Sequence, residues 1–321
     1  MAAGLGFFRS LSLRGQRHRV SSALVAPYNT AVYFRLTRRA APVPRVRGEK
    51  PQFHREVRIM ESDYGLELTN NSKTSWAFSI PRSLTCIMAT DVCLRLCYGK
   101  GIRYQSKVQK AKRQRNFRTI ELLLAKGGAE LLAQNLVSLI DQVRPADWLA
   151  ASITGANTQT PWTLRIHDVG DFFSVAYVDA WRLAAEQRPL CSLWFYTRSF
   201  LDSALFEALT KLASLANCQG WLSIDSENYA AGLLAYAQKP GIWKLAVLQE
   251  EPDQLNEDLL SGLTPVANKD IVSFPYHRGG YHAAPVQQPG VLTCPAVLGV
   301  YRLESNARKL RPCQACSFCL P

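Results

Sequence analysis

The first 48 residues contain no acidic side chain, although they carry nine arginines. The first acidic residue is Glu49, so nine of the thirteen net positive charges belong to this segment. An Arg-rich, acid-free start is typical of organellar transit peptides, while a flexible basic extension or a misplaced start codon before Met60 gives the same composition. Three prolines and the lack of a sustained amphipathic period argue against a helix there. We therefore predict a disordered basic leader over residues 1–60, outside the fold.

The sequence also lacks a long apolar run. Residues 229–237 are among its longest uncharged apolar stretches, and they fall well short of the roughly 20 residues that cross a bilayer. This absence argues against an integral membrane protein, so we predict no membrane partner. With 47% hydrophobic and 20% charged residues, the chain has enough apolar side chains for a sizeable core and is neither disordered nor fibrous.

Cysteine is plentiful, and seven of the nine cysteines fall in two short groups. The first group is Cys86, Cys93 and Cys97. The second group is Cys294, Cys313, Cys316 and Cys319. An odd total at such short spacings argues against a disulfide framework and favours metal ligation in a reducing compartment, so we predict a cytoplasmic protein. The remaining two, Cys191 and Cys218, stand in apolar surroundings and are expected to be buried core thiols.

Apolar runs alternate with helical patterns along most of the chain. Strands are predicted at residues 74–81, 163–167, 193–197, 221–224, 244–248 and 270–274. Helices are predicted at residues 175–187, 202–215 and 228–237, and over 104–143 with an interruption at Gly127 and Gly128. Continuous apolar strands that alternate with helices are typical of a parallel sheet buried on both faces. We predict an α/β fold, a partial or full (β/α) barrel of TIM type, with a doubly wound open sheet as the alternative.

We assign residues 61–290 to this barrel-like domain and residues 291–321 to a cysteine-rich, metal-binding C-terminal extension. Five successive strands end in polar residues, among them Asp171, Arg198, Asp225, Glu250 and His277. Because functional groups gather at the carboxyl ends of barrel strands, we expect one shared polar mouth. The alternative for Asp171 and Asp225 is that they cap the helices that follow.

His167 is a candidate catalytic residue, which would orient a substrate or relay a proton, and a hydrogen-bonded structural histidine is the alternative. Together with Asp171 and Arg198 it forms the candidate catalytic set.

The terminal cysteine group has the spacing of an iron-sulfur ligand set. A C-x2-C-x2-C run with a remote Cys-Pro, here Cys294-Pro295, matches the ligands of a [4Fe-4S] cluster. A structural zinc site with four cysteine ligands is the alternative. The first group has three cysteines on the loop after the first predicted strand, and three thiolates hold a [4Fe-4S] cluster while leaving one iron open. Its alternative is a zinc site completed by a histidine such as His54 or His167.

Several spaced motifs resemble those of the phage-type gene product 88 family. This resemblance does not imply any particular activity. The resemblance covers residues 66–321 and rests on residues 71–81 with the first cysteine group, on Arg165-x-His167-x2-Gly170-Asp171-Phe172, Trp181 and Tyr196-Thr197-Arg198-Ser199, and on the second cysteine group.

The layout also resembles the radical S-adenosylmethionine (SAM) enzymes, in which a partial β/α barrel carries three cluster cysteines after its first strand. The resemblance implies that Cys86, Cys93 and Cys97 hold the cluster and that the terminal group holds an auxiliary cluster. By the same likeness Tyr98 lies beside the first cluster, and Gly170 and Asp171 approach SAM. From its place at a strand end, Asp225 is a further candidate for binding the cofactor, as a polar anchor. The sequence departs from the family in its C-x6-C-x3-C spacing and in Val169, which replaces a glycine.

Nine cations and no acidic residue lie between Asp91 and Glu121. They suit a nucleic acid or another phosphate-bearing ligand at residues 95–118, and a solvated helical face is the alternative. We therefore predict an iron-sulfur protein, of radical SAM type, that acts on an unknown substrate. The rival prediction is a zinc-stabilised nucleic-acid-binding protein without redox chemistry.

Overall fold

The computed structural model describes residues 65–69, 73–74, 76–148, 161–250, 270–275, 291–297 and 311–321. The predicted leader and the polar residues that follow the sixth predicted strand, such as His277, lie outside these ranges. None of the helices in them is long and apolar enough to span a membrane.

Strands and helices alternate over most of the described chain. The strands are β1 (Ala77–Ser79), β2 (Thr163–Val169), β3 (Ser192–Thr197), β4 (Cys218–Ile224), β5 (Trp243–Gln249), β6 (Ile271–Pro275) and β7 (Val291–Thr293). The α-helices are α1 (Arg82–Thr85), α2 (Asp91–Leu96), α3 (Ile102–Gln105), α4 (Lys107–Asp141), α6 (Val175–Gln187), α7 (Ser203–Ala213), α8 (Tyr229–Gln238) and α10 (Pro312–Cys316). Two short 3-10 helices, η2 (Tyr98–Lys100) and η3 (Ser199–Leu201), complete the set.

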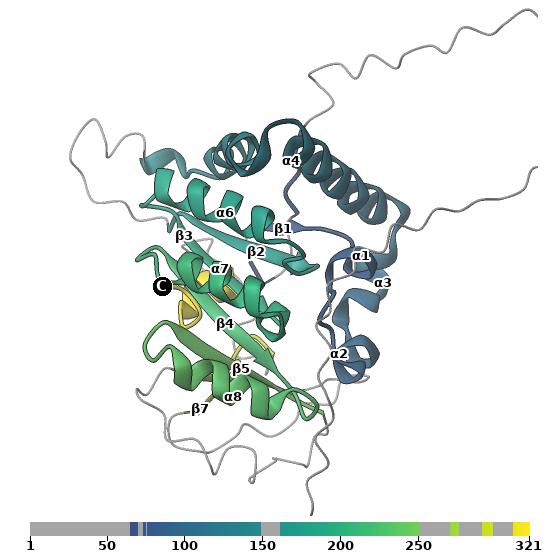
Figure 1. Ribbon diagram of the computed structural model, residues 1–321, viewed down its shortest axis with the longest axis vertical. Helices are drawn as coiled ribbons and strands as arrows, with labels where there is room; N and C mark the ends of the chain where they lie inside the picture. Colours follow the sequence, from purple (N-terminus) through teal and green to yellow (C-terminus); the bar gives the residue numbers. More distant parts are fainter. Residues whose placement is uncertain are drawn as a thin grey trace, which may run out of the picture. The chain divides into compact units, whose positions relative to one another are not determined.

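The seven strands form one parallel sheet whose spatial order follows the sequence, from β1 to β7. The α/β class and the parallel sheet are thus confirmed. A doubly wound sheet contains a point where the strand order reverses, and this order contains none. Helices α6, α7 and α8 lie on the same side of the sheet (Figure 1). The sheet is open, because no pairing joins β1 to β7 among the described strands.

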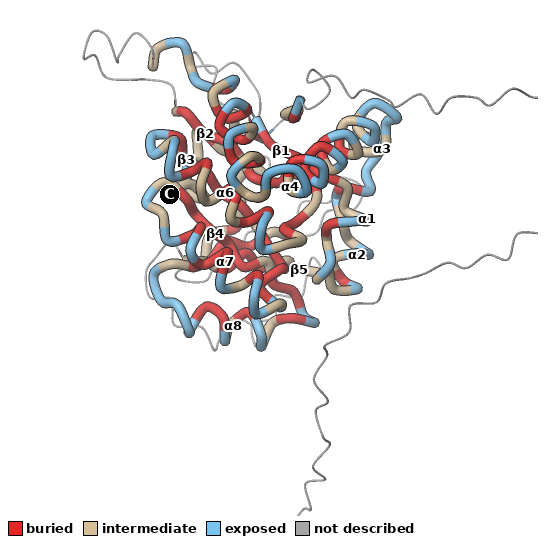
Figure 2. The backbone as a smooth tube through the Cα atoms, turned by 45° about the horizontal axis from the view of Figure 1, so that its top comes forward, coloured by how far each residue is buried: buried red, intermediate tan, exposed pale blue. Residues whose placement is uncertain are grey.

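The two faces of the sheet have different partners, and the side chains of β3 show how they alternate. Leu193 and Phe195 point into the main core that the sheet forms with α4, α6, α7 and α8. Trp194 and Tyr196 point the other way, toward a cavity on the inner face. The buried strands and the exposed outer sides of the helices are distinguished by colour in Figure 2. Period-two alternation therefore separates core residues from cavity residues.

The C-terminal segment packs on the inner face. Phe318 and Cys319 contact a small apolar cluster centred on Trp221 of β4, and the Trp221 indole donates a hydrogen bond to the Cys319 carbonyl at 3.1 Å. The predicted boundary between residues 290 and 291 falls immediately before β7, which pairs with β6 and belongs to the sheet. The last residues therefore cover the inside of the open sheet.

Helix α4 contains the predicted interruption. Gly127 and Gly128 have non-helical backbone angles, with φ of 67° at Gly128, so two helices meet at a kink. A positive φ of this size favours glycine, because other residues meet a steric penalty there. The second half of α4 packs against α6 through buried residues such as Leu132, Leu136 and Ile140.

Candidate functional site

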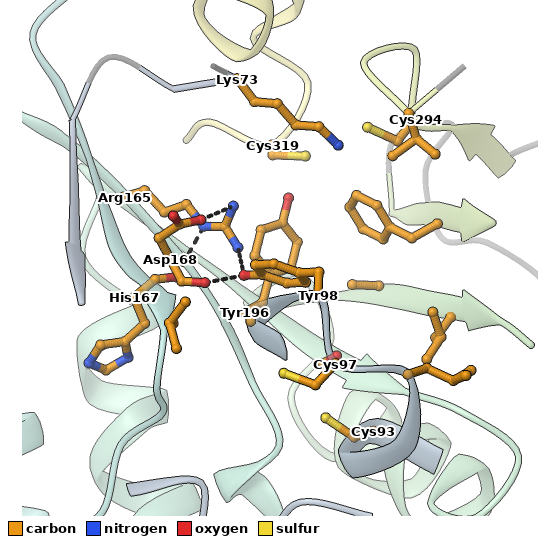
Figure 3. A pocket seen from close by; sticks show the side chains of 18 of the residues that line it. Lys73, Cys93, Cys97, Tyr98, Arg165, His167, Asp168, Tyr196, Cys294 and Cys319 are labelled. Carbon is orange, nitrogen blue, oxygen red and sulfur yellow. Dashed lines mark hydrogen bonds and ion pairs between the residues drawn. The ribbon is translucent and has the colours of Figure 1, made fainter. Parts of the chain in front are cut away.

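A cavity of about 830 Å³ opens on the inner face of the sheet and brings both cysteine groups together. Its volume lies within the usual range for small-molecule and cofactor sites. Among the residues that line it are all seven grouped cysteines, Cys86, Cys93, Cys97, Cys294, Cys313, Cys316 and Cys319. In Figure 3, Cys93 and Cys97 lie on one side and Cys294 and Cys319 on the other, with Tyr98 and Tyr196 between them.

The first cysteine group is carried by two short helices that follow β1. Cys86 is the C-terminal cap residue of α1, Cys93 lies within α2, and Cys97 follows its last turn. Thr90 caps the N-terminus of α2 by accepting a hydrogen bond from the Cys93 backbone N–H at 3.0 Å. The same hydroxyl donates to the Asp225 carboxylate at 2.6 Å. The end of β4 therefore fixes the helix that presents Cys93.

The thiols of the first group influence one another. Burial raises the pKa of Cys86, and nearby Asp171, Cys93 and Cys97 raise it further. Burial also raises the pKa of Cys93, against the lowering effect of the Arg198 guanidinium, which hydrogen-bonds to it. Within the ranges that the structure describes, no three His, Cys, Asp or Glu side chains are placed to hold a single metal ion. The three thiols are nevertheless close enough to act on one another's ionisation.

The second cysteine group is assembled from β7 and the C-terminus. The Cys294 N–H donates to the Ser273 carbonyl of β6 at 2.9 Å, and the Cys313 N–H donates to the Lys73 carbonyl at 2.9 Å. Burial, together with the neighbouring Cys294 and Cys316, raises the pKa of Cys313 to about 11 and that of Cys319 to about 12. The four thiols therefore form one neighbourhood.

Asp171 joins the ends of β2 and β3. Its carboxylate accepts hydrogen bonds at 2.8 Å from the Thr197 hydroxyl and from the backbone N–H groups of Phe172 and Arg198. Burial raises the pKa of Asp171 to about 6, although these hydrogen bonds act in the opposite direction. Both carboxylate oxygens are therefore engaged within the protein.

Asp225 pairs with Arg198, at a distance of 2.9 Å between the Arg198 Nη2 and the Asp225 Oδ2. The other terminal nitrogen of Arg198 donates to the Ser223 carbonyl at 2.6 Å. Arg198 lines the cavity, whereas Asp225 is not among its lining residues. Asp225 therefore positions Arg198, which in turn faces Cys93.

Tyr98 directs its hydroxyl into the cavity. The hydroxyl donates to the Asp168 carbonyl and accepts from Arg165 Nη2 at 3.1 Å. The Arg165 guanidinium lies over the Tyr196 ring, 5.0 Å from its centroid, as Figure 3 shows from close by. Arg165 thus links the two tyrosines and also raises the local positive charge beside Cys313, whose pKa it lowers.

The His167 ring lies among aromatic side chains on the α6 side. Its Nε2 is 2.7 Å from the Tyr177 hydroxyl, and its centroid is 4.6 Å from that of Phe172. Burial, with a smaller effect of Arg165, lowers the pKa of His167 to about 3, so the ring is neutral at physiological pH. Its backbone carbonyl accepts a hydrogen bond at 3.1 Å from Nε of Arg165, a cavity residue. The contact with Tyr177 is the kind that the structural alternative predicts, whereas the buried Nδ1 has no hydrogen-bond partner within the described residues.

Gly170 is required by both conformation and space, and its replacement by alanine is expected to destabilise the fold. Its φ is 100°, and a Cβ there would lie 2.4 Å from Ile80 Cγ1 and 2.8 Å from the Ile80 carbonyl oxygen. Gly241 has a similar φ of 81° with nothing within 4 Å of a Cβ, so it is a matched control. We expect a loss of about 3 kcal/mol for Gly170→Ala and about 1 kcal/mol for Gly241→Ala. Urea denaturation measures both, and equal losses would show that the contact with Ile80 relaxes freely.

Some residues of the site were not identified from the sequence, because nothing in their residue type distinguishes them. Thr90 resembles any other helix cap until its hydroxyl is seen on Asp225. Trp194 and Phe274 line the cavity, and the alternation of side chains along a strand is the signal that separates them from core aromatics. All predicted site residues except Asp225 line the one cavity.

Comparison with known proteins gives a family and no further relative. The model of the gene product 88 family matches residues 55–321. No curated protein and no solved structure matches the chain. The match includes both cysteine groups and every described strand and helix. The chain therefore belongs to the gene product 88 family.

Proposed function

We propose that the protein binds two [4Fe-4S] clusters, one on each cysteine group, and acts as a radical SAM-type enzyme. The observation that carries the proposal is the convergence of seven cysteines, in two neighbourhoods, on one cavity at the inner face of a parallel sheet. A [4Fe-4S] cluster is held by Cys thiolates, and the two groups supply three and four of them.

The three-cysteine group has the ligand count of a reactive site. Cys86, Cys93 and Cys97 would leave one iron open to a second ligand, as an open coordination position distinguishes reactive metal sites from structural ones. When bound, such a cluster supplies one electron to SAM, which yields methionine and, with a hydrogen atom taken from the substrate, 5′-deoxyadenosine. Arg198 faces Cys93 and provides a positive charge there.

Under this proposal, residues around the two cysteine groups fix the strand ends and border the space between the groups. Gly170, which has no side chain, keeps the chain close to Ile80 at the end of β2. Asp171 holds the β3 end by its hydrogen bonds to Thr197 and Arg198. The Tyr98 hydroxyl, held by Arg165, borders the space between the two cysteine groups. The terminal group, with four thiols, would bind an auxiliary cluster.

Metal analysis of anaerobically purified protein tests this proposal. We expect a brown protein with about eight iron and eight sulfide ions per chain, since each cubane contains four of each. On reduction with dithionite, the protein is expected to convert SAM to methionine and 5′-deoxyadenosine, with buffer or protein groups supplying the hydrogen atom in the absence of the substrate. A colourless protein with stoichiometric zinc and no sulfide would overturn the cluster proposal. Clusters without SAM cleavage would leave an electron-transfer or structural iron-sulfur protein.

A further inference from the structure

We propose that the substrate of this cavity is a nucleotide, either free or as part of a single strand, whose phosphate is held at the cavity mouth. This inference rests on the proposed function for the chemistry, but the binding it predicts is independent of SAM. Its basis is a group of cations and aromatic rings around the mouth, which we call the mouth patch and define as Tyr98, Lys100, Arg103 and Tyr104. All four line the cavity.

Some cations of the basic segment hold the fold together away from the cavity, and others line the cavity. Arg113 is buried and donates to the Tyr104 carbonyl at 2.6 Å. Lys112 and Arg115 pair with Glu67, at 3.5 and 2.6 Å. These three have structural tasks and are not counted toward a ligand. Lys100 and Arg103 are exposed and line the cavity, while Lys107 and Lys110 continue the positive surface along the start of α4.

The cavity lining carries an excess of positive charge. Its acidic residues are Asp168 and Asp171, and both are engaged, Asp168 with Arg165 and Asp171 with the end of β3. The lining cations are Lys73, Arg82, Arg95, Lys100, Arg103, Arg165 and Arg198, of which Arg95 and Arg198 pair with carboxylates outside the lining, Glu250 and Asp225. Arg165 and Arg198 lie beside cysteines of the two groups and offset thiolate charge there. The cations at the mouth therefore favour an anionic ligand group.

Aromatic rings beside these cations favour a nucleotide over other anions. The Tyr98 side chain is 54% exposed although its hydroxyl is held inside the cavity. Tyr104 meets it edge to face, with 5.6 Å between the ring centroids, and Tyr104 is anchored by a hydrogen bond to Asp168. A fixed, half-exposed ring next to Lys100 offers a stacking surface for a base together with a contact for its phosphate.

Fluorescence anisotropy with a labelled single-stranded RNA tests the inference on the full chain purified anaerobically, without SAM. The variant Lys100→Gln/Arg103→Gln removes two mouth cations, and Lys211→Gln/Lys239→Gln removes two exposed cations from α7 and from the end of α8 as a matched control. We expect the mouth variant to weaken binding by roughly tenfold and to reduce the salt slope by about two, since each lost phosphate contact lowers the slope by about one. The control variant is expected to bind like the wild type.

Competition experiments separate the sources of the phosphate. Displacement of the RNA by a nucleoside monophosphate assigns the site to a free nucleotide, and displacement by an unlabelled oligonucleotide alone assigns it to a strand. Equal competition by a glutamate oligopeptide, or equal weakening by the two double variants, would overturn the inference. So would the absence of RNA and nucleotide binding in protein with its full iron content, and that result would leave the proposed function standing. Conversely, RNA binding by a colourless protein loaded with zinc would overturn the cluster proposal and leave the nucleotide-binding inference standing.

Discussion

Replacing Cys93 with alanine is expected to remove about half of the bound iron and to abolish SAM cleavage, because one of two four-iron clusters then loses a ligand. The Cys93 thiol is held by its own short helix, which Thr90 caps and Asp225 anchors. Its partners in the cavity wall are Cys86 and Cys97. With only two thiolates left, the first cluster has no stable ligand set, and the open iron that SAM requires is lost with it.

Two further variants make this result specific. Cys316→Ala removes a ligand of the second group and is expected to lower the iron content similarly while leaving 5′-deoxyadenosine formation measurable. Cys191→Ala changes a thiol that is fully buried in the main core and is not among the lining residues of the cysteine cavity, so iron content and SAM cleavage are expected to stay at wild-type levels. Iron and sulfide assays, with chromatography of the nucleoside product, measure these effects. Loss of SAM cleavage in all three variants would contradict the proposal that the first cysteine group binds the reactive cluster and the second group an auxiliary one.

The sequence predicted the long helices and most strands well, because their signals are local. It missed the short helices α1, α2 and α10, and the cysteines that it placed on a loop after the first strand lie at the end of α1 and within and after α2. Helix α6 occupies the predicted residues 175–187, and β3 begins one residue before the prediction. Each central strand is an apolar run between turn residues, which marks a strand wherever it packs. The strand β7 has only three residues, so its pattern is too short to distinguish from a loop, and its pairing with β6 comes from tertiary structure.

The sequence predicted the two cysteine groups that line the cavity. It did not predict which way the His167 side chain points or where the C-terminal segment packs. Regular alternation along β2 would place the His167 side chain on the cavity face with that of Arg165. His167 instead has a φ of 64°, and its ring packs beside Phe172 and Tyr177. A backbone exception of this kind has no signature in residue type, since histidine adopts a positive φ only occasionally. The packing of the C-terminal segment onto Trp221 is likewise a long-range contact that spacing does not encode.

Asp225→Asn is expected to destabilise the fold by about 3–5 kcal/mol, since it leaves the charge of Arg198 buried without its partner. The side chains of Arg198 and Asp225 are 7% and 0% exposed, so water cannot replace the lost carboxylate. The matched control is Glu186→Gln, which breaks an ion pair between Arg182 and Glu186 on the outer surface of α6. An exposed pair of this kind contributes about 0–1 kcal/mol. Chemical denaturation of the two variants under the same conditions gives the comparison.

The double variant Arg198→Met/Asp225→Leu distinguishes the cost of an unpaired charge from the value of the pair itself. Removing both charges leaves no buried ion without a partner, so the double variant is expected to be more stable than Asp225→Asn. It still loses the hydrogen bond from Arg198 to the Ser223 carbonyl, and those from Thr90 and the Glu227 N–H to the Asp225 carboxylate. A double variant as unstable as Asp225→Asn would show that these hydrogen bonds, rather than charge, hold β3, β4 and α2 together. In both cases α2, which carries Cys93, is joined to the end of β4 through the hydrogen bond from Thr90 to Asp225. The stability of the Asp225 variants therefore reports on how firmly the first cysteine group is held.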